Sequence, residues 1–168
     1  IAGVGRQPNS YKLNLEKVGV ETDAKGIKVN EYLQTSNSKI YAMGDVLSKN
    51  QPHLTPVSSF EGAYLGETLV KDEPQKIAYP AIPTIIFGTA KLAEVGHLAD
   101  EGIHTKTLDL SSWYTYKRIN DPLAKLKVAL NEKREIVGAS TVSSVADEVI
   151  NLINILIQQK MTLADVEK

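Results

Sequence analysis

The sequence contains no cysteine, which excludes a disulfide framework, thiolate chemistry and any cysteine-based metal site within its 168 residues. Its three histidines, His53, His97 and His104, fall at no HxxxH or HExxH spacing, so no zinc site is expected. The formal net charge is only −1, without the basic excess that accompanies nucleic-acid binding, and no run of like charges suggests a binding tail.

Long hydrophobic runs are also missing. The longest apolar stretch, residues 150–157, is interrupted by Asn151 and Asn154 and is too short and too polar to span a bilayer. The N-terminus has no basic region followed by an apolar one, so no signal peptide is expected and we predict a cytoplasmic protein. Hydrophobic residues make up 42% and charged residues 23%, which is typical of a globular chain that buries a core.

The first half of the chain reads as a mixture of short strands and one helix. Residues 1–5 look like the end of a buried strand, and a chain that begins there is interpreted as a piece of a longer protein. Residues 26–30 and 40–43 are predicted strands, the second one buried. Residues 56–70 are predicted to be helical, with Thr55 as N-cap. A domain boundary is placed across residues 72–79.

The second half reads as a separate α+β unit. Alternating or apolar runs indicate strands, and the last two flank a polar turn at residues 131–134 that indicates a hairpin. Ser144 and Asp147 resemble a capping box at the start of a long helix. The predicted strands are residues 82–87, 91–95, 105–110, 123–130 and 135–142, and the predicted helices are residues 98–103, 144–160 and one beginning at 162–165.

Asp45 is the first candidate binding residue, because Gly44 and Asp45 follow the predicted strand 40–43. A carboxylate at the carboxyl end of a strand can accept hydrogen bonds from ligand hydroxyls. The alternative is a turn aspartate that bonds its own backbone. Nearby, residues 54–56 indicate a helix start, whose free N–H groups carry partial positive charge, although an ordinary capped helix has the same signature.

Three other features have both a functional and a simpler structural interpretation. His53 is interpreted as a solvated loop residue, because no partner acid lies at a useful spacing. The aromatic and basic cluster at residues 113–118 fits a base-stacking edge or a subunit interface, and we favour the interface. Gly3 and Gly5 form only a partial phosphate loop, since Pro8 prevents a following helix.

Several segments, in this order, resemble the motifs of one enzyme family. Residues 2–9 are similar to A-x-G-R-x-P-N, residues 35–45 to T-S-x-x-x-I-Y-A-x-G-D and residues 54–57 to L-T-P-V. Residues 82–87 and 94–96 are similar to the opening of the same family's C-terminal domain. The chain thus resembles the C-terminal portion of the pyridine nucleotide–disulfide oxidoreductases, which include glutathione reductase and dihydrolipoamide dehydrogenase.

This resemblance implies an α/β and α+β architecture. Residues 1–75 would be the C-terminal part of an FAD/NAD(P)-binding region, and residues 79–168 a truncated dimerisation domain, with a sheet backed by helices, in a homodimer. Gly44 and Asp45 would contact the ribityl or phosphate part of FAD, and the backbone at His53, Leu54 and Thr55 would meet the flavin. In the whole enzyme, electrons would pass from NAD(P)H through FAD to a redox disulfide and then to a small-molecule or disulfide substrate.

The family's Gly-rich FAD loop, its redox disulfide and its C-terminal His–Glu pair have no counterpart in these 168 residues. The resemblance therefore implies part of a flavin site without a redox centre, and no reductase activity of the chain alone. The alternative is a self-associating structural module with no flavin role. A free-standing nucleotide-binding regulator would need a complete phosphate loop. No residue selects among glutathione, dihydrolipoamide and metal-ion substrates, or between NADH and NADPH.

Overall fold

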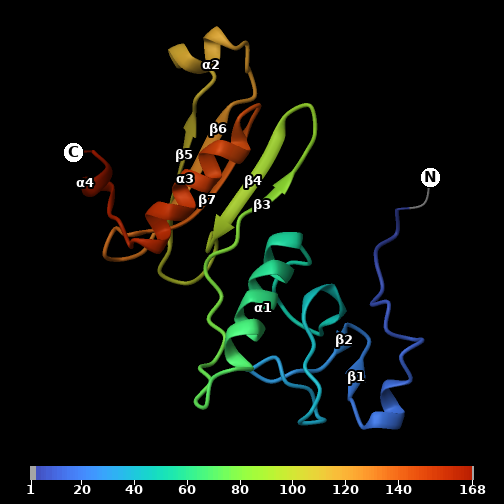
Figure 1. Ribbon diagram of the computed structural model, residues 1–168. Coiled ribbons are helices and arrows are strands. Elements are labelled where there is room, and N and C mark those ends of the chain that lie inside the picture. Colours follow the sequence, from blue (N-terminus) through green and yellow to red (C-terminus); the bar gives the residue numbers. More distant parts are fainter. Residues whose placement is uncertain (1–2, 168) are drawn as a thin grey trace. The chain divides into compact units, whose positions relative to one another are not determined.

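The computed structural model describes residues 3–167 and has a mixed α/β fold (Figure 1). It divides into two compact units, Ile1–Ala78 and Tyr79–Lys168. Across the described residues, no helix has both the length and the apolar character needed to cross a membrane.

The first unit contains one long regular element, the helix α1 (Thr55–Thr68), and little sheet. The strands β1 (Thr22–Asp23) and β2 (Gly26–Ile27) form a two-stranded antiparallel hairpin. Two single-turn 3₁₀ helices, η1 (Leu15–Val18) and η2 (Gly44–Val46), complete the regular structure. The other described residues of this unit form turns and loops.

The core of the first unit is small, and α1 supplies one side of it. Leu33, Leu47 and Leu65 form a buried cluster, which Tyr41 and Tyr64 flank. Pro56 stands in the first turn of α1, where a missing N–H costs nothing. The N-cap is Leu54 and makes no side-chain cap, so the prediction of Thr55 as N-cap was wrong.

Two strand predictions in the first unit were wrong. Residues 40–43 form no buried strand: Tyr41 makes a single antiparallel bridge to Gln34, and Met43 is exposed. Residues 3–5 are irregular and exposed, while residues 1–2 lie outside the described residues. An apolar run becomes a strand only where neighbouring strands can accept its backbone hydrogen bonds, and the described part of this unit provides few. The predicted strand 26–30 is reduced to the two residues of β2.

The second unit is built on a five-stranded antiparallel sheet in the order β3-β4-β7-β6-β5. The predicted hairpin is confirmed, since β6 pairs with β7 across a turn in which Arg134 adopts a left-handed conformation. The strands are β3 (Thr84–Ile86), β4 (Lys91–Gly96), β5 (His104–Asp109), β6 (Lys125–Leu130) and β7 (Ile136–Ser143).

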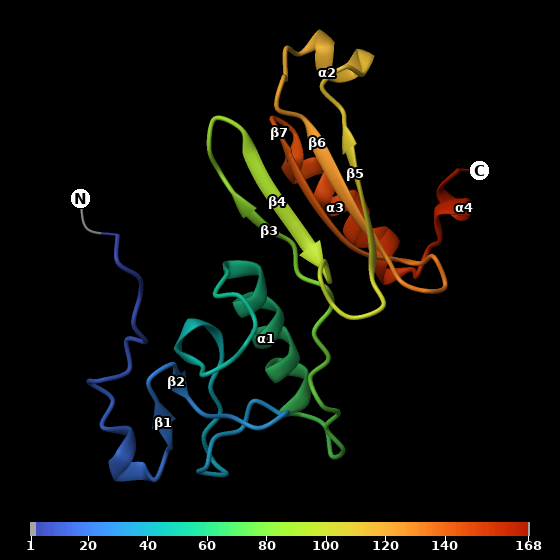
Figure 2. The same ribbon diagram turned by 180° about the vertical axis from the view of Figure 1, so that it is seen from behind.

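One face of this sheet is covered by the helix α3 (Ala146–Gln158), as Figures 1 and 2 show. Ile150 and Ile153 of the helix join a buried cluster with Val95 and Ala139 of the sheet. This helix lies within the predicted helical range 144–160, so the prediction is confirmed. Burial of the apolar face of the helix is its main source of stability. A short helix α4 (Leu163–Val166) follows, and Thr162 and Asp165 form its capping box.

Three details of the second unit differ from prediction. Residues 98–103 form a turn between β4 and β5, where the chain has only seven residues to reverse direction. The N-cap of α3 is Val145 and not Ser144, and no side chain caps this helix; the backbone N–H of Ser144 donates to the carboxylate of Asp121 at 2.6 Å. A short helix, α2 (Tyr114–Arg118), was not predicted.

The aromatic and basic cluster at residues 113–118 forms α2 and its N-cap, and its aromatic side chains differ in burial. Trp113 and Tyr114 are exposed, whereas Tyr116 is buried against Leu110 and Ala124. Burial, together with the nearby negative charge of Asp121, raises the pKa of the Tyr116 phenol. Tyr116 therefore belongs to a small core, and the interface role of its two exposed neighbours stays a prediction.

We predict that the second unit is the more stable half. Its central strand β7 pairs on both sides and lies under α3, whereas the first unit has two-residue strands and a three-leucine core. Native-state hydrogen exchange should therefore be slowest for amides of β7 and faster throughout residues 1–75. Slower exchange in residues 1–75 than in the sheet would contradict this assignment.

Candidate functional site

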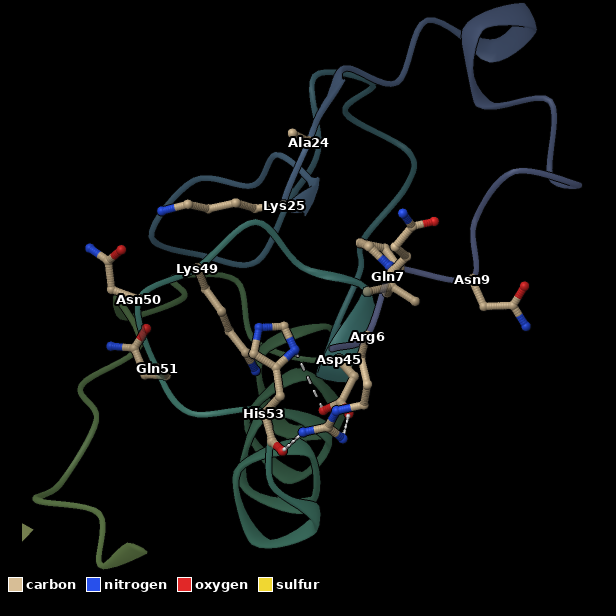
Figure 3. A pocket seen from close by; sticks show the side chains of 12 residues that line it. Arg6, Gln7, Asn9, Ala24, Lys25, Asp45, Lys49, Asn50, Gln51 and His53 are labelled. Carbon is tan, nitrogen blue, oxygen red and sulfur yellow. Dashed lines mark hydrogen bonds and ion pairs between the residues drawn. The ribbon is translucent and has the colours of Figure 1, made fainter. Parts of the chain in front are cut away.

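The first unit contains a pocket of about 620 Å³, within the range usual for small-ligand sites. Three segments form it: residues 6–9, the turn of the β1–β2 hairpin, and the loop that runs from η2 to α1 (Figure 3). Most of the residues that line it have polar or basic side chains; the lining residues are Arg6, Gln7, Pro8, Asn9, Ala24, Lys25, Asp45, Val46, Lys49, Asn50, Gln51 and His53.

Asp45 lies at the centre of a charged group in this pocket, with its side chain 49% exposed. One carboxylate oxygen lies 3.5 Å from Nη1 of Arg6, and the other lies 4.0 Å from Nδ1 of His53. Figure 3 shows these three side chains gathered together. The contact with Arg6 joins segments 39 residues apart, which differs from the local turn bonding considered above. Exposed pairs of this kind add little stability, and this carboxylate can exchange them for ligand hydroxyls.

His53 was interpreted as a solvated residue without a partner acid, and the second part of that interpretation was wrong. Asp45 is its acid partner at 4.0 Å, and the ring is only partly exposed. The backbone oxygen of His53 also accepts a hydrogen bond from Arg6 at 3.4 Å. Folding brings the three residues together across a loop, which no short sequence spacing reveals.

Leu54 and Thr55 follow His53 at the start of α1 but are not among the residues that line the pocket. Leu54 is half-buried and Thr55 is exposed. The N–H groups of a first helical turn have no intrahelical acceptor, so this helix start can still offer donors beside the pocket.

Gly44 holds a backbone conformation that favours glycine. Its φ is 81°, and a Cβ at this position would lie 3.2 Å from Oγ of Ser58 on α1. Its buried N–H donates to Oε2 of Glu61 at 2.6 Å. Asp45 therefore begins from a fixed backbone position, directly against α1.

The loop that carries Asp45 is anchored a second time by the β1–β2 hairpin. Leu47 is fully buried and forms a parallel bridge with Ile27. The hydroxyl of Ser48 donates to Asp23 at 2.7 Å and so lowers the pKa of that carboxyl. Gly26 makes this packing possible, because a Cβ there would lie 2.2 Å from the backbone oxygen of Val46.

Sequence reasoning missed a third anchor, the buried ion pair between Glu61 and Lys49. Their side chains are 0% and 6% exposed, and Nζ of Lys49 lies 2.5 Å from Oε1 of Glu61. The available signal was helical periodicity: Glu61 falls on the same face of α1 as Val57 and Leu65, both buried. A glutamate among core positions indicates a buried, paired carboxylate.

Among residues 3–167, no group of three or more histidine, aspartate or glutamate side chains is placed to hold a metal ion. The pocket instead combines one hydrogen-bond-accepting carboxylate with several cationic side chains. That combination suits a ligand that carries both hydroxyls and negative charge.

The profile of the family described as "Pyridine nucleotide-disulphide oxidoreductase" matches residues 1–62. Among individual proteins, the chain is 41% identical over 147 residues to the "Uncharacterized 19.7 kDa protein in mercuric resistance operon" of Staphylococcus aureus. That match covers 83% of this chain and 82% of the relative.

Complete reductases are also similar. The mercuric reductase of Staphylococcus aureus is 32% identical over 98% of this chain, and the glutathione reductase of Burkholderia cepacia is 32% identical over 98%. The chain spans 31% and 38% of the length of these two enzymes.

The fold matches that of solved flavoprotein disulfide reductases. The HOCl-induced flavoprotein disulfide reductase RclA from Escherichia coli superimposes with a TM-score of 0.85 and 23% identity, over 96% of this chain and 39% of that one. At this identity the likeness concerns the fold alone.

We predict that Gly26→Ala loosens the Asp45 loop. The new methyl group would meet a backbone oxygen, and the φ of 142° is strained for alanine, so the first unit should lose about 1–3 kcal/mol, as overpacked sites do. Gly66→Ala in α1 is the matched control: its Cβ meets nothing within 4 Å, and it should stabilise by up to about 1 kcal/mol. Hydrogen exchange of α1 amides measures both changes. Equal exchange in the two variants would show that the hairpin does not support the loop.

Proposed function

Because the chain belongs to the pyridine nucleotide-disulphide oxidoreductase family, we propose that it supplies part of an FAD site and the homodimer interface of an FAD-dependent NAD(P)H:disulfide oxidoreductase. The observation that carries the flavin part is the convergence of Arg6, Asp45 and His53 on one pocket. A cytoplasmic location is part of the same proposal.

The donors and acceptors of the pocket fit the non-ring part of FAD. The carboxylate of Asp45 accepts hydrogen bonds from ribityl hydroxyls, and Arg6 and Lys25 offer positive charge to phosphate oxygens. Gly44 fixes the backbone from which Asp45 extends. The backbone from His53 to Thr55 leads into the first turn of α1, whose partial positive charge favours a negatively charged flavin edge.

FAD, when bound, carries electrons between NAD(P)H and a disulfide. Within the present chain, the residues bind and orient the cofactor; none of them is a thiol that could accept those electrons. The proposal therefore assigns no reductase turnover to this chain by itself. The substrate of such an enzyme is a small molecule or a disulfide, and no residue of this chain selects between them.

The dimer part of the proposal is supported by the outer surface of α3. Leu152 and Ile155, one turn apart, are 65% and 56% exposed on the side of the helix that faces away from the sheet. Apolar side chains adjacent on one helix face are a usual subunit contact. The alternative function, a structural module that self-associates without flavin, uses the same surface and differs in ignoring FAD.

We expect Asp45→Ala to weaken FAD binding by the chain at least tenfold, because one charged acceptor for ribityl hydroxyls is lost. Asp72→Ala removes an exposed carboxylate outside the pocket and should leave the affinity unchanged. Quenching of flavin fluorescence on titration gives both dissociation constants. Equal affinities for wild type and Asp45→Ala would refute the role of Asp45 in binding FAD. NADPH oxidation by the chain with added FAD would refute the proposal that the chain has no reductase turnover by itself.

We expect light scattering to give the chain a mass of twice 18.4 kDa, with or without FAD. Replacing Leu152 and Ile155 by glutamate should yield a monomer, because like charges would face each other across the contact. Val70→Glu places the same charge on an exposed apolar position of the first unit and should leave the dimer intact. A monomeric wild-type chain, or a dimeric double variant, would remove the support for this interface.

A further inference from the structure

The buried carboxylate of Glu61 has a role that goes beyond the packing of α1. Its two oxygens have different partners. Oε2 accepts a hydrogen bond from the backbone N–H of Gly44 at 2.6 Å, and Oε1 accepts one from Nζ of Lys49 at 2.5 Å. We propose that Glu61 is the positioning residue of the flavin-contacting loop 44–49. This inference rests on the proposed function of Asp45, which lies between the two bonded residues.

One side chain on a rigid helix thereby fixes both ends of a six-residue loop. Gly44 is the first residue of η2, and Lys49 is the last loop residue before the stretch that leads to His53. Between these two points the backbone can present the side chain of Asp45 to the pocket in only a narrow range of directions. The helix supplies the fixed reference, because Glu61 stands in the middle of α1.

Stability alone does not account for this arrangement. Removing a carboxylate and an ammonium group from water is costly, and buried ion pairs are often replaced by apolar pairs with no loss of stability. Position 61 shares the buried face of α1 with Val57 and Leu65, so an apolar residue would fit the pattern of that face. What an apolar residue could not do is accept the N–H of Gly44, and that bond sets the orientation of Asp45.

Glu61 holds a different part of the loop from the part held by the β1–β2 hairpin. Asp23 and Ile27 hold the middle of the loop through Ser48 and Leu47. Without Glu61, this anchor would still hold residues 47–48, but Gly44 and Asp45 would be free to turn about it. Loss of Glu61 should therefore act on the beginning of the loop and leave the contact between hairpin and loop in place.

The test compares Glu61→Gln with Glu61→Met, two side chains of similar length that both lack the charge. Glutamine keeps an oxygen that can accept the Gly44 N–H, whereas methionine does not. Amide exchange by NMR should show the Gly44 N–H at least tenfold faster in Glu61→Met than in Glu61→Gln. Exchange at Ser48, whose N–H donates to the backbone oxygen of Ile27 in the hairpin, should be equal in the two variants. FAD affinity should be lower for Glu61→Met, and the melting temperatures of the two variants should be similar.

Equal Gly44 exchange in the two variants would overturn the proposal, as would Gly44 exchange that rises only in step with global unfolding. If Glu61→Met does not fold, amide exchange in the wild-type chain tests the proposal instead. Its Gly44 amide must exchange at least a hundredfold more slowly than that of Asp45; comparable rates for the two amides would refute the role of Glu61. The exchange measurements need no flavin, so failure of FAD to bind would count against the proposed function and not against the positioning role.

Discussion

The arrangement of the first unit depends on hydrogen bonds made by side chains, which fix the positions of loops that backbone pairing in a sheet would otherwise fix. Its strands have two residues each, so backbone ladders fix very little of its loop structure. The carboxylate of Glu61, on α1, and the carboxylate of Asp23, on the hairpin, each accept hydrogen bonds from the loop 44–49. The position of the pocket, and of Asp45 within it, follows from these two groups.

The second unit is held together in a different way. An antiparallel sheet with α3 on one face buries alternate residues of β4 and β7, and its backbone hydrogen bonds are satisfied between strands. A partly buried ion pair between Lys91 and Asp147 joins the first residue of β4 to the first turn of α3, and the hydrogen bond from Lys91 lowers the pKa of Asp147. The same chain thus contains one unit ordered by apolar burial and one in which polar anchors decide the geometry.

Sequence patterns predicted most of the second unit and only part of the first. The β6–β7 hairpin and α3 were found because alternation and helical periodicity report directly on a buried face. Residues 40–43 have the composition of a strand, yet only Tyr41 pairs with another segment. Whether an apolar segment finds a neighbouring strand to pair with depends on the whole fold and cannot be read from the segment alone. Residues 98–103 contain helix formers, but the seven residues that link β4 to β5 must pass β7 and β6, which lie between those two strands, and a compact helix is too short to do so.

The candidate site shows the same division. Asp45 and Gly44 were identified from the order of motifs along the chain. The contacts of Arg6 with Asp45 and with the backbone oxygen of His53 join residues 39 and 47 positions apart, which no local pattern reports. Helical periodicity could have indicated that Glu61 is buried, but its partners Gly44 and Lys49 lie 17 and 12 residues away, and no local spacing links them to it.

The central claim is that the anchored loop presents Asp45 to FAD, and an NMR titration of the isotope-labelled chain with FAD tests it most directly. The account predicts that amide signals of Gly44, Asp45 and His53 shift saturably, while those of β7 in the second unit stay in place. Saturable shifts confined to other surfaces, or no shifts in residues 44–53 at millimolar FAD, would contradict it.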